Sequence, residues 1–469
     1  MYPPQTSLIP AAVALTRYIA EHGFSGNYPY WYLGTTPVRY LTGPVVPNIL
    51  IVLKNLFSFP NYFVSVYCLL FIVWFLSVLG WFLLIKTMSK NTKVALLASM
   101  LLVVLPWRYF NTLVLADLPF TVSRSLLPFV LFAFCKTKKE NKLWFWVSVA
   151  LCSVLLLIDT TIIPDVLIGL FAIAFFKAFN PKLSKFQKTT VYIRRSIKVV
   201  VLSIIISIVW YTPGYWLTIL FNPSTGGVTG AGAILRVLDL GKATLPVVAA
   251  LATVYLSHRF KSRLSVFISV WFFAFGFLTF FRFISDYDFW QDWSTWIYQL
   301  EIGAALFVAC LFGRKSYFVI QVCTLLAFVV LTVIFYNHFD KLPLISKVPP
   351  GYVTTLDKLD ELTGGSELVF ISGSSVWWAN ALFDVKQVRG GVDRVSVNPV
   401  WSRAAWVFRE SQDLELNTTN LKDLGVKYVL VHADDSQEYF QDFKYVSKWE
   451  ALGKSVWSDN GDIIYSISD

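Results

Sequence analysis

The residues best suited to chemistry in this 469-residue chain are charged side chains at the ends of long apolar runs. The stretch "LPWRYFNTLVLADLPF" (105–120) holds Arg108 and Asp117, and Arg124 follows inside an apolar run. Charge at a membrane boundary is costly unless it is paired, hydrated or used, so each group is a candidate for function. Because the fork of an arginine bonds two phosphate oxygens at once, Arg108 and Arg124 are candidates for holding a phosphate ligand. The alternative for both is an ion pair that fastens helices together.

A second charged stretch, "FFRFISDYDFWQDWSTWIY" (280–298), combines one arginine with three aspartates and many aromatic rings. Rings beside carboxylates suit a carbohydrate, and an arginine suits a phosphate. We therefore expect four residues of this stretch to hold a sugar or a lipid-linked phosphate: Arg282, Asp286, Asp288 and Trp290. The alternative is an aromatic belt at the membrane interface with solvated acids.

The beginning of the chain is rich in aromatic rings and turn residues, as in "HGFSGNYPYWYLGTTPVRY" (22–40). Glycine and proline in this segment shape turns that bring the rings together. We expect Tyr30, Trp31 and Arg39 to contribute to a substrate site, with the aromatic residues lining a sugar pocket. Glu21, the first acidic residue of the chain, directly precedes the segment.

The composition is that of an integral membrane protein, since 56% of residues are hydrophobic, 15% are charged and the mean hydropathy is +0.59. The net charge of +11 does not indicate a nucleic-acid binder, because the lysines and arginines fall in short clusters between apolar runs. Two runs, 119–135 and 164–178, could be half-helices that enter and leave on one side. About ten runs are candidate membrane spans: 62–86, 93–107, 119–135, 143–159, 164–178, 198–220, 243–257, 264–284, 299–312 and 317–336.

The charges between these runs predict the sidedness of the protein. Every second connection is basic, as in 86–93 and 177–198, whereas the alternate connections carry aspartates and few positive groups. Basic loops face the cytoplasm, so residues 1–61 and the region from about 340 are expected on the outer side of the plasma (inner) membrane. An outer N-terminal segment needs a preceding helix to carry it across, which predicts that an upstream helix is missing. A translocated N-terminal tail is the alternative.

The C-terminal region is polar and predicts a small α/β domain. Two short β-branched runs, 366–373 and 426–433, are typical of buried strands, and Asn460-Gly461 indicates a closing hairpin. The segments 354–362 and 418–425 have the pattern of helices. The predicted fold is thus an α-helical polytopic membrane protein of about ten spans with a C-terminal extracytoplasmic α/β domain. Its expected parts are a first outer loop (1–61), a transmembrane region (62–337) and the soluble domain (338–469).

Motifs of soluble enzymes are not visible in the sequence. The four histidines are scattered, so neither zinc-ligand spacing nor a Ser/His/Asp signature is present. "TGGVTGAG" (225–232) lacks the lysine of a phosphate-binding loop and favours a flexible outer loop. The five cysteines all lie in apolar segments, which gives no disulfide framework. No cofactor is expected, and nothing in the sequence supports a divalent metal.

Three segments carry a resemblance to a known family: the loop 22–40, the stretch "PWRYFNTLVLADLPFTVSRSLLPFVLF" (106–132) and the exported "LKDLGVKYVLVH" (421–432). They resemble a large bacterial and archaeal group of multi-pass membrane proteins with a GT-C-like fold, which includes proteins described as "6-pyruvoyl-tetrahydropterin synthase related". The resemblance implies a transferase that takes a sugar from a polyprenyl-phosphate donor on the outer face. It also implies a catalytic Asp or Glu in the first outer loop.

The sequence departs from that pattern where the catalytic acid is expected. The segment from Tyr2 to Ser7 contains Gln5 and no acid, and an amide does not accept a proton at neutral pH. Either the acid is lost with an upstream helix, or Glu21 or a later aspartate such as Asp117 replaces it, or the protein is not catalytic.

In an active enzyme the carboxylate would deprotonate the acceptor hydroxyl, and Arg108 or Arg282 would stabilise the departing polyprenyl phosphate. Two other classes stay open. One is a non-catalytic scaffold for envelope polysaccharide assembly, and the other is a transporter for a lipid-linked substrate.

Overall fold

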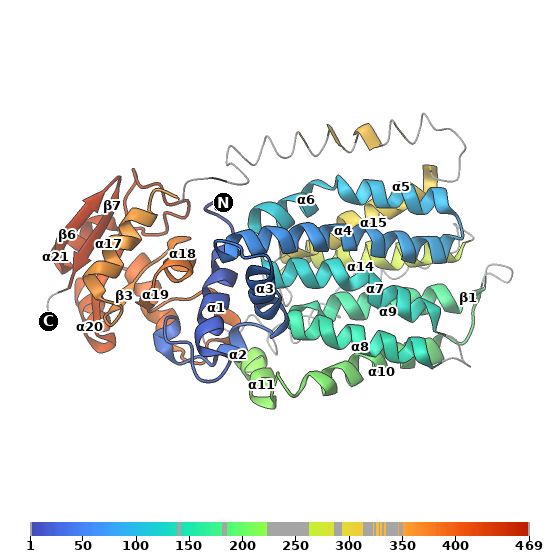
Figure 1. The fold of residues 1–469 in the computed structure, drawn as a ribbon, viewed down its shortest axis with the longest axis horizontal. Coiled ribbons are helices and arrows are strands. Elements are labelled where there is room, and N and C mark those ends of the chain that lie inside the picture. The colour runs from blue at the N-terminus through green and yellow to red at the C-terminus, as the bar shows by residue number, and fades with distance from the viewer. Residues whose placement is uncertain are drawn as a thin grey trace. The chain divides into compact units, whose positions relative to one another are not determined.

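A computed structural model describes residues 2–137, 142–180, 185–222, 262–285, 293–312 and 350–467, with a few residues between 322 and 346. The chain forms two compact units (Figure 1). One unit consists of Cys68–Thr212 and Val228–Lys341, and we call it the helical unit. The other consists of Met1–Tyr67, Pro213–Gly227 and Leu342–Asp469, and we call it the sheet unit.

The helical unit is built from long apolar helices that lie side by side (Figure 1). In the described residues, five helices are long and apolar enough to cross a membrane, or six if a pair bent by 55° counts as one span. The bent pair is Thr92–Val103 with Pro106–Leu115, and the bend lies where Pro106 begins the second helix. The chain is therefore a multi-pass membrane protein. Its described helices are α4 (Tyr62–Ser89, which begins in the sheet unit), α5 (Thr92–Val103), α6 (Pro106–Tyr109) with the π-helical turn η2 (Phe110–Leu115), α7 (Leu118–Lys136), α8 (Leu143–Ile158), η3 (Thr160–Ile162), α9 (Ile163–Ala178), α10 (Thr189–Ser207), α14 (Arg263–Ser285) and α15 (Trp293–Phe312), with a short hairpin of β1 (Phe179–Asn180) and β2 (Lys185–Phe186) after α9.

The described helices correct part of the predicted set of spans. The two runs predicted as possible half-helices form helices of 19 residues, Leu118–Lys136 and Thr160–Ala178, that are long enough to cross. The predicted span 198–220 is wrong as a single helix, because α10 ends at Ser207 and α11 begins only at Pro213. Proline lacks the backbone N–H that would continue a helix across this point. The predicted span 243–257 lies outside the described residues, as does most of 317–336.

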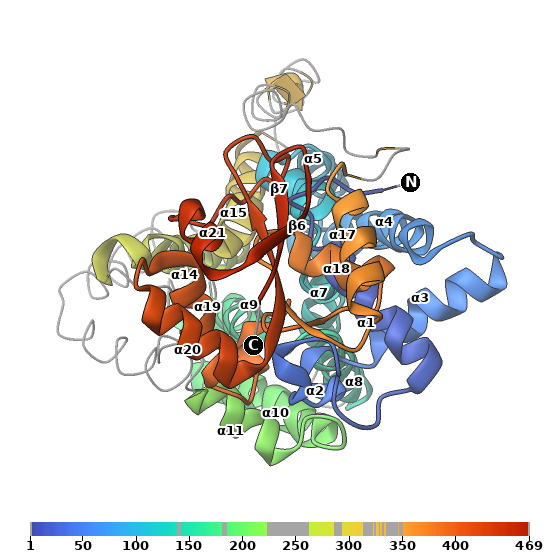
Figure 2. The same cartoon turned by 90° about the vertical axis from the view of Figure 1, so that its left-hand side faces the viewer.

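The sheet unit contains a five-stranded sheet with strand order β4-β3-β5-β7-β6. Strand β3 is parallel to both β4 and β5, whereas β7 is antiparallel to β5 and β6. Helices α17, α20 and α21 pack against the strands (Figure 1 and Figure 2). The strands are β3 (Leu368–Phe370), β4 (Lys386–Gln387), β5 (Val426–His432), β6 (Lys454–Asp459) and β7 (Asp462–Ser466), and the helices of two or more turns are α1 (Ile9–His22), α3 (Val45–Leu56), α11 (Pro213–Phe221), α17 (Val353–Thr363), α18 (Ser375–Leu382), α19 (Val400–Glu410) and α20 (Leu414–Leu424), with the short α2 (Val38–Leu41) and α21 (Trp449–Leu452).

The small C-terminal sheet confirms the elements predicted from local patterns. The β-branched runs form β3 and β5, and both are largely buried. The turn at Asn460-Gly461 joins β6 to β7, with both residues in the left-handed region that a tight hairpin needs. Helix α20 ends at Leu424 and is capped by Gly425, whose φ of 69° lets its N–H reach the carbonyl oxygen of Leu421.

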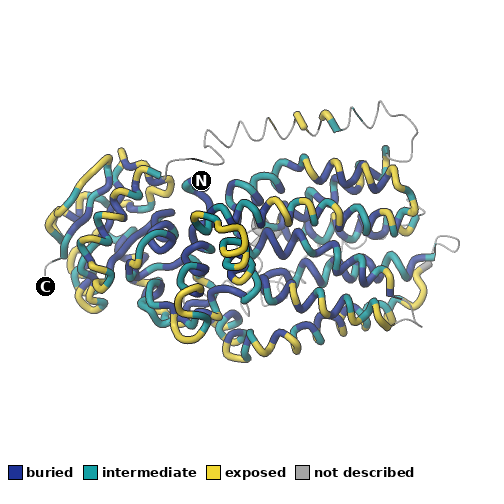
Figure 3. Tube along the Cα trace, viewed as in Figure 1, coloured by how far each residue is buried: buried dark blue, intermediate teal, exposed yellow. Residues whose placement is uncertain are grey.

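The N-terminal segment is part of the core of the sheet unit. The prediction instead divided residues 1–61 and 338–469 into two separate parts. Trp31 is fully buried, and its Nε1 donates to Asn380 Oδ1 at 2.9 Å. The backbone N–H of Gln387 in β4 donates to the carbonyl oxygen of Tyr30 at 2.9 Å. Tyr32 is also fully buried, and its hydroxyl donates to Asp393 at 2.7 Å. Figure 3 shows the resulting run of buried positions through the unit.

Candidate functional site

A buried ion cluster joins three elements of the helical unit near the start of α7 and α9. Arg124 in α7 is 1% exposed and is paired with Asp159 through Nη1 and with Asp165 through Nη2, the latter at 3.1 Å. The same guanidinium donates to the carbonyl oxygen of Thr161 at 3.1 Å and lies 4.0 Å from the centre of the Phe120 ring. Ion pairing between α7, η3 and α9 is the alternative foreseen for Arg124, and the structure shows that pairing.

Local sequence explains why the acids of this cluster are in place. Asp159 is the N-cap of η3, where its Oδ1 accepts from the backbone N–H of Thr161 at 2.9 Å. Asp165 lies in the first turn of α9, close to the positive end of the helix dipole. Two carboxylates therefore face one guanidinium away from water. Breaking such a pair would leave an uncompensated buried charge, which costs roughly 3–5 kcal/mol.

A second buried arginine, Arg108, lies in α6 of the same unit. Its Nη1 donates to the carbonyl oxygen of Leu102 at 2.9 Å, and its guanidinium lies 4.8 Å from the centre of the Trp74 ring. Within the described part of the chain, Arg108 Nε and Nη2 have no hydrogen-bond partner. Buried N–H donors of a charged group are costly to leave unpaired. Arg108 thus has two buried N–H-bearing nitrogens that are suited to bind an anion, whereas Arg124 has one among the described residues.

The carboxylate of Glu301 in α15 holds the start of α6. Its two oxygens accept from the backbone N–H groups of Trp107 at 3.0 Å and Arg108 at 3.1 Å. A carboxylate at the first turn of a helix pairs with otherwise unsatisfied N–H groups and with the helix dipole. Glu301 thereby fixes the backbone on which Arg108 is carried.

Sequence reasoning did not select Glu301, although a signal was present. It is the single acidic residue in the apolar helix 293–312, and an ionisable group inside a membrane helix is a functional candidate by default. Asp165 was likewise not among the selected site residues. Both are placed by contacts from distant parts of the sequence, which no local pattern reveals.

The two proposed catalytic acids lie in different units. Asp117 is the N-cap of α7 in the helical unit, where its Oδ1 accepts from the backbone N–H of Phe120 at 3.4 Å. Its side chain is half-buried. Glu21 is exposed near the end of α1 in the sheet unit. The role of general base stays a proposal for each.

The predicted sugar-binding residues of the N-terminal segment lie in the sheet unit. Trp31 packs inside the core, so its ring does not line an open surface in this structure. Tyr30 is half-buried, and burial together with the Asp384 carboxylate raises its pKa to about 12, which keeps the phenol neutral. Arg39 is exposed, with its guanidinium 5.9 Å from the centre of the Tyr40 ring.

Of the four candidates from the 280–298 stretch, the structure describes only the backbone of Arg282. The backbone of Arg282 belongs to α14, and nothing is stated of its side chain. Asp286, Asp288 and Trp290 lie outside the described residues. Among the residues that the structure does describe, no group of three or more His, Cys, Asp or Glu side chains could hold a metal ion.

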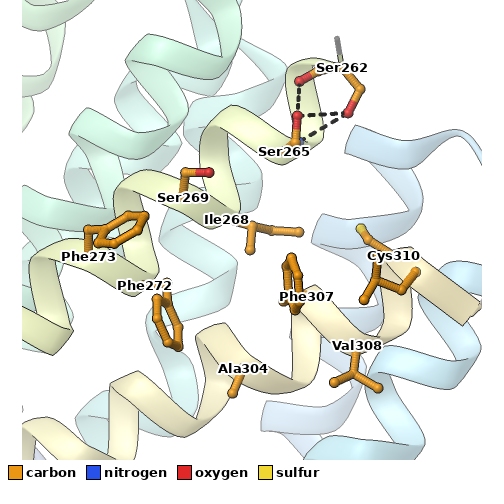
Figure 4. Close-up of a pocket in the computed structure, with 11 residues that line it drawn as sticks. Ser262, Ser265, Ile268, Ser269, Phe272, Phe273, Ala304, Phe307, Val308 and Cys310 are labelled. Carbon is orange, nitrogen blue, oxygen red and sulfur yellow. Dashed lines mark hydrogen bonds between the residues drawn. The ribbon is translucent and has the colours of Figure 1, made fainter. Parts of the chain in front are cut away.

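A cavity of about 490 Å³ lies between α14 and α15 of the helical unit. Figure 4 shows Phe272 of α14 and Phe307 of α15 extending from the two helices at this cavity. Its lining is aromatic and aliphatic apart from three serines and one cysteine, and it includes no charged side chain. The cavity is therefore suited to an apolar chain rather than to a phosphate or to acid-base chemistry.

Comparison of the sequence with protein-family models and with curated proteins finds no match. Comparison of the structure finds the oligosaccharyltransferase AglB of the archaeon Archaeoglobus fulgidus. In its complex with an inhibitory peptide and a dolichol-phosphate, AglB matches 100% of this chain and 70% of its own, with a TM-score of 0.56 at 12% identity. A second AglB structure, tethered to an acceptor peptide that contains an NVT sequon, gives a TM-score of 0.57 at 10% identity over the same shares. Likeness at this identity defines the fold alone, and the chain therefore shares the fold of this oligosaccharyltransferase over the matched part.

Proposed function

We propose that this protein is a GT-C-type glycosyltransferase that transfers a sugar from a polyprenyl-phosphate donor to an envelope acceptor on the outer face of the membrane. The observation that carries the proposal is the match of the entire chain to AglB, whose structure was determined with dolichol-phosphate bound. That match supports the implication drawn above from the resemblance to the GT-C-like group. Fold likeness alone leaves the donor sugar and the acceptor open.

The contacts inside the sheet unit support the sidedness that this function needs. The N-terminal segment and the C-terminal region are hydrogen-bonded to each other, as between Tyr30 and Gln387. This bonding supports a placement of both segments on the same side of the membrane. The basic connections between the apolar runs then favour the outer side for both.

The proposed mechanism uses Arg108 for the leaving group and a carboxylate for the acceptor. An acceptor hydroxyl attacks the anomeric carbon, its proton passes to the carboxylate, and the bond to the polyprenyl phosphate breaks with inversion. Asp117 is the first candidate base and Glu21 the second. The unpaired Nε and Nη2 of Arg108 are suited to stabilising the phosphate oxygens as charge develops on them. The apolar cavity between α14 and α15 is suited to part of the lipid chain.

A non-catalytic scaffold is the second candidate, and one observation favours it. Among the described residues of the helical unit, the buried carboxylates of Asp159 and Asp165 are committed to Arg124, and the carboxylate of Glu301 is committed to the start of α6. A residue held this way organises helices without needing any chemistry. A transferase releases polyprenyl phosphate, whereas a scaffold does not.

The deciding experiment measures the release of polyprenyl phosphate from polyprenyl-phosphate sugars by the full-length protein in lipid vesicles. We expect release by the wild type, a loss of about 10²-fold in D117N, and a loss of similar size in R108K, which keeps the charge but not the fork. R194Q, at an exposed arginine of α10, is the matched control and should retain wild-type release.

Two outcomes would count against the transferase. If the folded wild type releases no lipid phosphate from any donor, the scaffold is favoured. If release is normal in both D117N and R108K, these residues lose their proposed roles, and E21Q then tests the second candidate base. Melting temperature and elution as a single species establish that each variant is folded.

A further inference from the structure

Three side chains meet at one end of the inner strands β3, β5 and β7, in the order nucleophile, base and acid. Ser375 begins α18 just after β3, His432 ends β5, and Asp462 begins β7 directly opposite His432. Ser375 Oγ lies 3.0 Å from His432 Nε2, and His432 Nδ1 lies 2.9 Å from Asp462 Oδ1. These are the mutual distances by which a hydroxyl nucleophile, a general base and an orienting carboxylate are recognised.

The surroundings of Asp462 fix the ring of His432. Asp462 accepts hydrogen bonds from Thr355 Oγ1 at 3.0 Å and from Ser436 Oγ at 2.5 Å, as an ionised carboxylate does. The proton of a neutral His432 therefore lies on Nδ1, toward Asp462, which leaves Nε2 as an acceptor facing Ser375. The Ser375 hydroxyl has one other acceptor within reach, the carbonyl oxygen of Ser372 at 2.8 Å.

The carboxylate of Glu438 occupies the space beside this pair. One oxygen accepts from the backbone N–H of Ser374 at 2.9 Å, and the other accepts from the backbone N–H of Ser375 at 2.9 Å and lies 4.0 Å from His432 Nε2. Consecutive N–H groups next to a nucleophile are the donors that stabilise the oxyanion in acyl transfer. Glu438 thus occupies the two N–H groups that would face an oxyanion.

The backbone is shaped to let Glu438 come this close. Gly373 has a φ of 77°, and a Cβ at this position would lie 2.8 Å from Cδ of Glu438. The segment that carries Glu438, residues 434–442, is also held by the bond from Ser436 to Asp462, and near the surface by the pairing of Asp442 with Arg389 at 3.2 Å and Arg409 at 3.0 Å. These arginine and aspartate side chains are 20–24% exposed, so their pairing resists opening less than a buried pair does.

We propose that Ser375, His432 and Asp462 form a second active site that hydrolyses carboxylic esters, and that Glu438 closes it in the present structure. This site is separate from the transferase proposed above and does not depend on it. Because Ser375 and His432 are fully buried, the segment 434–442 must swing away before an ester can enter. The two N–H groups that Glu438 releases then face the ester carbonyl.

The reaction balances with water as the only co-reactant. Ser375 Oγ attacks the carbonyl carbon and its proton passes to His432 Nε2, while the N–H groups of Ser374 and Ser375 stabilise the oxyanion. The ester C–O bond breaks, and the leaving alcohol takes the proton from Nε2. Water then attacks the acyl-serine, gives one proton to Nε2, and the carboxylic acid departs as Ser375 regains that proton. Asp462 orients the ring throughout and is a positioning residue.

The test is labelling of the full-length protein with a fluorophosphonate probe, which reacts with activated serines, followed by mass spectrometry of the Ser375 peptide. We expect slow labelling in the wild type, labelling at least 10-fold faster in E438A, none in S375A, and a loss of about 10²-fold or more in D462N. The matched control is S455A, which removes an exposed hydroxyl of β6 and should still be labelled at Ser375. Hydrolysis of p-nitrophenyl acetate should follow the same order.

Absence of the label overturns the proposal. If folded wild-type protein and folded E438A show no more label at Ser375 than S375A shows at that position, the three residues form a structural network only. If E438A does not fold, E438Q keeps the shape of the side chain, and the same comparison with S375A decides. Polyprenyl phosphate release is measured on the same samples, so failure of one proposal is distinguished from failure of the other.

Discussion

The ion cluster of the helical unit and the Ser375 network of the sheet unit are both buried, yet they are organised in opposite ways. Arg124 and its two aspartates come from regular helices and the turn between them, and each charge is matched by a neighbour. In the sheet unit, His432 lies between a hydroxyl and a carboxylate, and a second carboxylate comes from the surface segment 434–442. The first arrangement fixes packing, whereas the second leaves a nucleophile beside a base.

The comparison predicts its largest effect at Arg124. Replacing Arg124 with alanine leaves Asp159 and Asp165 buried without a counter-charge, so we expect the free energy of unfolding to fall by roughly 3–5 kcal/mol. Thermal unfolding of purified protein measures the change. R194A, at an exposed arginine of α10, should stay within about 0.5 kcal/mol of the wild type. Equal stability of R124A and R194A would contradict a packing role for the cluster.

The next effect is expected at Glu301, which bonds two backbone N–H groups with two oxygens. In E301Q the side-chain amide has only one oxygen to offer, so one N–H group at the start of α6 loses its partner. We expect a loss of about 1.5–3 kcal/mol, the range for hydrogen bonds to charged groups. Chemical denaturation compares this variant with E21Q, an exposed acid that should show little change. If E301Q is as stable as the wild type, water satisfies the backbone N–H groups at the start of α6.

A smaller loss is expected at Ser375. In S375A the ring of His432 keeps its bond to Asp462, and Nε2 loses the hydroxyl that lies 3.0 Å from it. The cost should be about 0.5–1.5 kcal/mol, the net value of one hydrogen bond. If S375A loses as much free energy of unfolding as R124A, the Ser375 network is as important for stability as the ion cluster, and the two regions do not differ in this respect. The stability of S375A is measured by the same unfolding assay.

The smallest effect is a pH dependence of the sheet unit. Burial lowers the pKa of His432, but its hydrogen bond to Asp462 and the carboxylates of Glu438 and Asp442 raise it, and the net shift is upward. A raised pKa in the folded state means that this contribution to stability is fully present below the unfolded value of about 6.5. It is lost as pH rises through the folded value. The protection of segment 434–442 against hydrogen exchange, taken relative to the intrinsic exchange rate at each pH, should therefore fall above pH 6.5, and H432Q should remove that fall.

Local patterns predicted the parts of the fold that local forces determine. The β-branched runs at β3 and β5 and the hairpin turn at Asn460-Gly461 follow from short-range preferences. The multi-pass membrane character follows from apolar length alone. The burial of Trp31 was not predictable, because its partner Asn380 lies 349 residues away in the sequence.

The candidate sites were predicted less well for the same reason. Arg108 and Arg124 could be selected as charges next to apolar runs, but the choice between ion pair and ligand depends on Asp159 and Asp165 reaching Arg124 from another helix. The Ser375, His432 and Asp462 side chains are separated by 57 and 30 residues. Such spacing matches no local signature, so only the folded sheet brings them together.

The bonds between the N-terminal segment and β4 have a consequence for synthesis. The ribosome makes Tyr30 and Trp31 long before Asn380 and Gln387, and the whole helical unit emerges in between. During that interval the aromatic side chains of the early segment have no interior to enter, and they need shelter at the bilayer surface or from a chaperone. If synthesis stops after the last membrane helix, these rings stay exposed. We expect such a truncated product to be degraded.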